Sequence, residues 1–395
     1  MRARYTAFID EKNRMTNALR VATSQIHKMD HHLNLSLACD VFASYSEFRG
    51  AVFTFPQIAH ALESAMFDDT ANHTYGNIVL HAYTAWLVQQ QYKLSGDAIY
   101  SGRVVLELLT RTYSSRNSPR LSLRFSLGYA NGFFHAAEWQ SVISTYTENT
   151  FDRRMASKYL SLCNVTRVFL PSCVHGAGHG FMMNAIIRAH DDIYDACRPL
   201  AFNSTAINQS DLDASLLMCG FTHLECHTGV YHAYISITVI ISNPALPYWL
   251  QPCNSVRRFA MACFMFAMND YDNEGFARSF ADPSVCKSQP MDSEHNMLGC
   301  ISMAAGGVDR NSANATNELI HMCDRAAGNL RQRWLACLYG ALAYGMIYDA
   351  SCAEIEARRL FLLPESRKLC TSNFLDWTTD VYMPRYPAWL LEMNG

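Results

Sequence analysis

The segment LECHTGVYHA at residues 224–233 returns in altered form three times further along the chain. The related segments are MACFMFAMND at 261–270, LGCISMAAGG at 298–307 and LACLYGALAY at 335–344. Their cysteines, Cys226, Cys263, Cys300 and Cys337, follow one another at intervals of 37 residues (263 − 226, 300 − 263 and 337 − 300). A fixed period of this length is typical of proteins built from structural repeats.

The same unit extends toward the N-terminus. Cys173, in PSCVHGAGHG, lies 53 residues before Cys226 (226 − 173), and the longer interval contains Asn203 and Asn208. YANGFFHA from Tyr129 and YGNIVLHA from Tyr75 share the end of the pattern without the cysteine. These segments bring the number of units to about seven. We call Cys173, Cys226, Cys263, Cys300 and Cys337 the marker cysteines.

Each unit is expected to hold two helices. Apolar residues between the repeated segments recur every three or four positions, as in LELLTRTY at 106–113, and few stretches alternate as strands do. Prolines and small residues separate these stretches, and Pro171 with Ser172 predicts a helix start just before Cys173. The fold class is therefore all-α, a series of α-hairpin repeats forming an α/α solenoid or a closed toroid. We expect an N-terminal helical region at 1–60, the repeats at 61–350 and a C-terminal cap at 351–395.

A second set of cysteines precedes the marker cysteines at 10 or 14 residues. Cysteines ten residues apart on one straight helix would lie ~15 Å from each other, so each pair is expected to span a helix-turn-helix corner. The predicted pairs are Cys163–Cys173, Cys253–Cys263, Cys286–Cys300, Cys323–Cys337 and Cys352–Cys370. Two arrangements remain for the last four cysteines: 197–226 with 39–219, or 219–226 with 39–197. Metal ligation or free thiols are the alternative, although no CxxC pair is present to form a zinc knuckle.

Cysteine content and glycosylation sequons favour an oxidising compartment. The chain has 14 cysteines, which is typical of secreted or lumenal proteins. Sequons N-x-[ST] begin at Asn34, Asn72, Asn164, Asn203, Asn208 and Asn314. Residues 1–20 contain no apolar core of a signal peptide. The mitochondrial intermembrane space is the alternative compartment, because small helical-hairpin proteins there share the C-x9-C spacing.

Composition narrows the possible partners. Hydrophobic residues make up 50% of the chain and charged residues 17%, so a large core is expected rather than disorder. The net charge of −3 leaves no broad basic surface for nucleic acid. No stretch of 18 or more residues is cleanly apolar, so no transmembrane segment is expected.

Histidines occupy one position of the repeat. His179 and His232 stand six residues after the marker cysteines Cys173 and Cys226, and His81 and His135 stand six residues after Tyr75 and Tyr129. Ala or Gly follows each of these histidines. If these helices line a concave surface, His81 and His135 would lie in a ligand cavity. The predicted metal ligands are His175, His179, His227 and His232, with zinc as the divalent metal, because imidazole is a common zinc ligand and positions i and i+4 share a helix face. The same surface could instead hold a small anionic ligand at helix N-termini, or a protein.

Two other interpretations of these histidines stay open. A histidine followed by a small residue also fits a structural position that hydrogen-bonds a neighbouring helix. Catalysis would need a carboxylate near the histidines, and Glu225 is the candidate general base. No G-x-S-x-G, P-loop, HExxH or Rossmann pattern is present.

One architectural resemblance involves these residues. Cys226-His227-Thr228-Gly229 resembles the Cys-His-Gly element of lanthionine-cyclase-like proteins, and WLACLYG at 334–340 is similar to their Trp-Cys-Tyr-Gly element. The order of the two elements is reversed, and the match covers only these fragments. The resemblance implies an α/α toroid with zinc held by cysteine and a Cys-His pair, which could not also be disulfide-bonded. The sequence thus predicts a glycosylated binding or interaction module, with a metal-dependent enzyme of the toroid type as the alternative.

Overall fold

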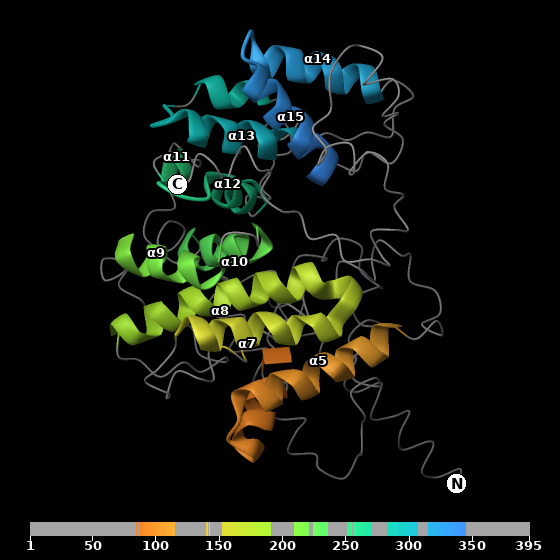
Figure 1. Ribbon diagram of the computed structural model, residues 1–395, viewed down its shortest axis with the longest axis vertical. Helices are drawn as coiled ribbons and strands as arrows, with labels where there is room; N and C mark the ends of the chain where they lie inside the picture. Colours follow the sequence, from red (N-terminus) through yellow and green to blue (C-terminus); the bar gives the residue numbers. More distant parts are fainter. Residues whose placement is uncertain are drawn as a thin grey trace, which may run out of the picture. The chain divides into compact units, whose positions relative to one another are not determined.

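A computed structural model gives the arrangement of the helices (Figure 1). It describes residues 84–85, 87–114, 140, 142, 152–190, 209–220, 224–235, 251–254, 256–269, 283–288, 290–306 and 315–344. These residues form helices and no strand, so the expected all-α class is confirmed for the described part. None of their helices is both long and apolar enough to cross a membrane.

The chain divides into two compact units, Met1–Ala206 and Ile207–Gly395. The predicted boundaries near residues 60 and 350 lie outside the described residues. The predicted three-part division therefore stays a prediction.

The first unit contains α5 (Ala98–Ser114), α7 (Arg153–Leu162), η1 (Cys163–Phe169) and α8 (Leu170–His190). Asp152 caps α7 by accepting a hydrogen bond from the Met155 backbone N–H at 2.9 Å. One face of α7 is buried, through Ala156, Tyr159 and Leu162. Contacts join α5 to both α7 and η1, and η1 to α8. The amphipathic pattern read from the sequence thus corresponds to one buried face on α7.

The second unit contains the remaining described elements. They are α9 (Gln209–Met218), α10 (Leu224–Ile235), α11 (Gln251–Asn254), α12 (Ala260–Asn269), η4 (Pro283–Ser288), α13 (Glu294–Gly306), α14 (Ala315–Ala327) and α15 (Arg331–Tyr344). α10 contacts α12, α12 contacts α13, and α13 contacts α15, so these four helices follow one another in space as they do in the chain (Figure 1).

A disulfide joins each helix that carries a marker cysteine to the segment before it. The described pairs are Cys163–Cys173, Cys219–Cys226, Cys253–Cys263, Cys286–Cys300 and Cys323–Cys337. Four of them are the pairs expected from cysteine spacing, and the 219–226 pair belongs to the second of the two open arrangements. Cys39, Cys197, Cys352 and Cys370 lie outside the described residues. We call α8, α10, α12, α13 and α15 the marker helices. The first segment of each is the helical part before it, which is α7 with η1, α9, α11, η4 and α14 in turn.

The marker cysteine occupies one of two levels on its helix. Cys173 and Cys263 are the fourth residues of α8 and α12, and Cys226 is the third of α10, so they stand in the first turn. Cys300 and Cys337 are instead the seventh residues of α13 and α15. Their disulfides span 14 residues rather than 10, and the difference is close to one helical turn. A marker helix whose disulfide spans 14 residues therefore has about one more turn before its cysteine than a marker helix whose disulfide spans 10.

Glycine lets α13 approach α15 and α12 closely. A Cβ at Gly340 of α15 would overlap the carbonyl group of Ser302 on α13. A Cβ at Gly299 would come within 2.7 Å of the Met261 backbone nitrogen on α12. The side chain of Ser302 donates a hydrogen bond to the Ala336 carbonyl at 2.9 Å, which holds α13 and α15 at this separation. Gly340 is therefore a packing position between α13 and α15.

Charged side chains also connect α13 and α15. The guanidinium of Arg333 donates from Nε and Nη2 to the two carboxylate oxygens of Glu294, each at 2.7 Å. A bidentate pair of this kind fixes the relative orientation of the two helices more than a single contact does.

We predict that Gly340→Ala lowers the free energy of unfolding by about 1–3 kcal/mol, because the added methyl must displace backbone. Gly→Ala in an unobstructed helix would instead stabilise by about 1 kcal/mol, so the sign of the effect tests the contact. Urea unfolding with disulfides intact measures it, with Gln332→Ala at an exposed position of the same helix as control. A stabilised Gly340→Ala variant would contradict the close approach of α13 and α15.

Candidate functional site

The histidines predicted as metal ligands lie on two marker helices. His175 and His179 are on α8, where His175 is half-buried and His179 is buried. His227 and His232 are on α10, where His227 is fully buried and His232 is half-buried. α8 belongs to the first compact unit and α10 to the second. His81 and His135 lie outside the described residues, so their placement in a cavity stays a prediction.

His227 holds its own helix against neighbouring elements. Its Nε2 donates a hydrogen bond to the Leu216 carbonyl of α9 at 3.2 Å, because a carbonyl oxygen can only accept. Its ring stacks on that of Phe259, with centroids 3.7 Å apart and planes 15° from parallel. A ring nitrogen that carries this proton does not coordinate a metal. These contacts favour the structural interpretation of His227.

His232 does not share a helix face with His227. Five residues at 100° each place their side chains about 140° apart around α10. By contrast, His175 and His179 are four residues apart and lie one turn from each other on one face of α8. Of the four predicted ligands, only His175 and His179 can coordinate one ion from a single helix.

The corner before α12 is held by polar groups from α10 and α13. Phe259 has a φ of 56°, in the left-handed region that is unfavourable for a residue with a bulky side chain. The preceding carbonyl, that of Arg258, accepts a hydrogen bond from the Tyr231 hydroxyl of α10 at 2.6 Å. The Cys253–Cys263 disulfide closes the corner. Tyr231 thus supports a strained backbone rather than lining an open cavity.

Two consecutive residues of α13 hold the same corner from the other side. The Asn296 side-chain amide donates to the carbonyls of Cys253 at 2.7 Å and Val256 at 3.2 Å. His295 accepts at Nε2 from the Ala260 backbone N–H, the first of α12, at 3.3 Å. Burial lowers the pKa of His295, so its ring is neutral and its proton is on Nδ1.

Sequence analysis missed His295 and Asn296. They stand five and four residues before Cys300, where the unit around Cys263 has arginine and phenylalanine and the unit around Cys337 has glutamine and arginine. Because no repeated residue type marks these positions, no spacing signal could have identified them.

Glu225, the candidate general base, is a buried carboxyl in the first turn of α10. Its side chain is 8% exposed, and this burial raises its pKa from 4.5 to about 7, against a smaller lowering by the Thr228 hydroxyl. A carboxyl that titrates near neutrality is suited to proton transfer. The same buried carboxyl destabilises the folded state at high pH, because its charged form is poorly solvated there.

The marker cysteines are not available as metal ligands. Cys226 and Cys337 are disulfide-bonded, so the zinc ligands implied by the resemblance to lanthionine-cyclase-like proteins are not formed by these sulfurs. Within the described part of the chain, no cluster of three or more His, Cys, Asp or Glu side chains could hold a metal ion. The resemblance therefore does not extend to the metal site.

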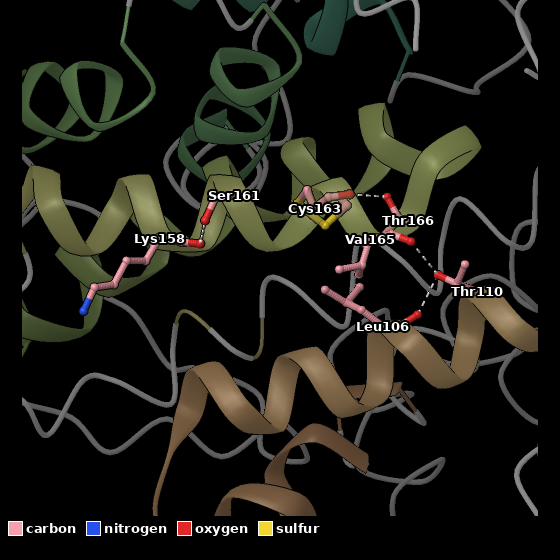
Figure 2. The surroundings of a disulfide bond; sticks show 8 residues. Leu106, Thr110, Lys158, Ser161, Cys163, Val165 and Thr166 are labelled. Atoms are coloured by element: carbon pink, nitrogen blue, oxygen red, sulfur yellow. Dashed lines mark hydrogen bonds between the residues drawn. A yellow bond between two sulfur atoms is a disulfide. The ribbon is translucent and has the colours of Figure 1, made fainter. Parts of the chain in front are cut away.

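The sequon at Asn164 lies in η1, next to a disulfide. The Asn164 side chain is exposed, whereas Thr166 is only 1% exposed. The Thr166 hydroxyl donates to the Cys163 carbonyl at 2.7 Å, and the Val165 carbonyl accepts from Thr110 of α5 at 3.5 Å (Figure 2). The other predicted sites, Asn34, Asn72, Asn203, Asn208 and Asn314, lie outside the described residues.

Comparisons with protein-family models, with curated proteins and with solved structures give no match.

We predict that Glu225→Gln reduces the loss of stability between pH 5 and pH 8. The carboxyl has a raised pKa in the folded state, so its favourable contribution is full below pH 4.5 and is lost as the pH rises through about 7. The loss in the unsubstituted protein is up to about 3 kcal/mol, and the glutamine variant, which does not titrate, lacks it. Urea unfolding at both pH values measures the difference.

Glu318→Gln is the matched control, because Glu318 is an exposed carboxylate in the first turn of α14. Parallel pH profiles for the Glu225→Gln variant and the unsubstituted protein would show that the Glu225 carboxyl is not buried in a charge-excluding environment.

Proposed function

We propose that this chain is an extracytoplasmic glycoprotein of disulfide-stapled helical hairpins that acts as a rigid binding or interaction module. The observation that carries the proposal is the set of five disulfides, each closing the corner before a marker helix. Disulfides persist in secreted and lumenal proteins and are rare where thiols are kept reduced. Corners built on disulfides therefore fit an oxidising compartment.

The hairpins are proposed to be copies of one repeat. Each marker helix is tied by a disulfide to the segment before it, and the marker helices of the second unit contact one another in chain order. Elements that contact mainly their neighbours form a solenoid, or a toroid if the ends meet. A rigid array of this kind supports binding because little conformational entropy is lost when a partner docks.

Glycans are proposed on the first segments. Asn164 is exposed in η1, Asn208 directly precedes α9, and Asn314 directly precedes α14. None of the six sequons falls within a marker helix. Bulky sugars on first segments leave the packing of the marker helices undisturbed.

A protein partner is proposed to meet the first segments, and a small anionic ligand is proposed to bind at the N-termini of marker helices. α7 buries only three of its ten residues, whereas α10 buries all but His232 and Tyr234. A marker helix of this kind offers little area for a protein interface, which commonly needs about 800 Å² on each side. The concave surface expected from the sequence is therefore better matched to a small ligand.

A metal-dependent enzyme is the second candidate function, and one observation favours it. His175 and His179 share one face of α8, as a pair of zinc ligands would. Zinc held at His175 and His179 would supply a Lewis acid.

We predict that mass spectrometry of the unreduced protein from its native source links the five described cysteine pairs and finds glycan on most of the six sequons. Peptide N-glycosidase converts each modified asparagine to aspartate, which identifies the site. A native chain with reduced cysteines and unmodified sequons would overturn the proposed compartment.

We predict that protein purified without chelator carries about one zinc ion per chain if the second candidate is correct, and that His179→Ala abolishes it. Elemental analysis measures the metal, and His321→Ala at an exposed position of α14 is the control. Absence of zinc from the unsubstituted protein, or its full retention in the His179→Ala variant, would leave the binding module as the function.

A further inference from the structure

The sequon Asn164-Val165-Thr166 begins directly after a disulfide-bonded cysteine. Cys163 ends α7 and starts η1, and its sulfur bonds to Cys173 on α8. Asn164 faces solvent, but the hydroxyl of Thr166 is buried and bonded to the Cys163 carbonyl (Figure 2). The two halves of the sequon therefore differ in accessibility once the corner has formed.

The glycosylation reaction needs access to both the asparagine and the threonine of the sequon. A transferase that requires Ser or Thr two residues after the asparagine must contact that hydroxyl. The hydroxyl of Thr166 cannot be contacted while it is 1% exposed and donates to Cys163. The folded corner is thus a poor substrate, although an attached glycan fits the fold because the Asn164 side chain points outward.

η1, which carries Thr166, packs against elements on both sides of it in the chain. α5 and α7 precede it, and α5 supplies the Thr110 hydroxyl that reaches the Val165 carbonyl. α8 follows it, and the disulfide ties the first turn of α8 to Cys163. Formation of this disulfide is therefore the step that completes the corner.

We infer that Asn164 is glycosylated only before the Cys163–Cys173 disulfide closes, so that the two reactions compete on the nascent chain. The inference rests on the proposed secretory compartment. The donor is a lipid-diphosphate-linked oligosaccharide: the Asn164 amide nitrogen bonds to the anomeric carbon, the carbon–oxygen bond to the diphosphate breaks, and the amide loses one proton. The disulfide forms by exchange with an oxidised dithiol catalyst, which is reduced as the two thiols are oxidised.

The two reactions have overlapping timescales. Cys173 follows Asn164 by nine residues (173 − 164), which takes about 0.5–2 s at a synthesis rate of about 5–20 residues per second. Disulfide formation takes seconds or longer. The result is partial occupancy of Asn164, whose sequon directly follows a disulfide-bonded cysteine.

The test measures site occupancy in the full chain directed into the endoplasmic reticulum by an added cleavable leader. Peptide N-glycosidase and mass spectrometry quantify modified Asn164 in the unsubstituted protein and in a Cys163→Ser, Cys173→Ser double variant. Occupancy is expected to increase in the variant, by about twofold if the two reactions have similar rates. Occupancy is set on the nascent chain, so the readout does not require the variant to fold.

Two further measurements separate the local disulfide from general effects. A Cys323→Ser, Cys337→Ser double variant removes another staple and is expected to leave Asn164 occupancy unchanged. A short pulse of reductant during synthesis is expected to raise Asn164 occupancy in the unsubstituted protein, with Asn72, which has no cysteine near it in the sequence, as the internal reference.

Equal Asn164 occupancy with and without the Cys163–Cys173 pair, or an equal rise in both double variants, would overturn the inference. So would an absence of glycan at Asn164 in every variant. The added leader makes this result independent of the native compartment. If the proposed oxidising compartment is wrong, the native protein will instead have reduced cysteines.

Discussion

The disulfide that ties each marker helix to the segment before it is the constraint on which the packing of these helices depends. α12, α13 and α15 have only 10, 13 and 14 residues, a length at which isolated helices are marginal in water. Closing a loop of 10 or 14 residues removes conformational freedom from the unfolded chain and stabilises the fold by about 2–3 kcal/mol. A helix that is apolar around its circumference, such as α12, then needs neighbours on every side. The disulfide fixes where α12 begins, and the neighbouring helices bury it.

The corner before α12 shows how one hairpin depends on the two beside it. The left-handed conformation of Phe259 costs about 1–3 kcal/mol, and the structure offsets it with side chains from α10 and α13. Tyr231 comes from the preceding marker helix, and His295 and Asn296 come from the following one. Their hydrogen bonds satisfy backbone groups that the turn leaves without helical partners. Buried polar residues therefore couple adjacent hairpins in this chain.

Cysteine spacing was sufficient to predict four of the five described disulfides because a short loop leaves few geometrically possible partners, whereas Cys219–Cys226 was one of two open arrangements. Spacing could not show which face of α10 meets α9. It therefore left open whether His227 is a metal ligand or, as its hydrogen bond to Leu216 favours, a structural residue. His295 and Asn296 could not be identified from the sequence because they bond to backbone atoms. Every residue type provides these atoms, so no particular partner residue marks the contact. The burial that raises the pKa of Glu225 is likewise a tertiary property, whereas its position in the first turn was readable from Cys226.

Marker helices and first segments differ in what a substitution can change. In α10 nearly every side chain is buried, so most replacements there would alter volume in a close-packed interior. In α7 the residues outside Ala156, Tyr159 and Leu162 are at least partly exposed, and replacements there change the surface with little effect on packing. The cysteine pairs link the two classes without requiring any particular residue on the exposed face. A binding function located on the first segments could therefore be altered residue by residue while the spacing of the staples is kept.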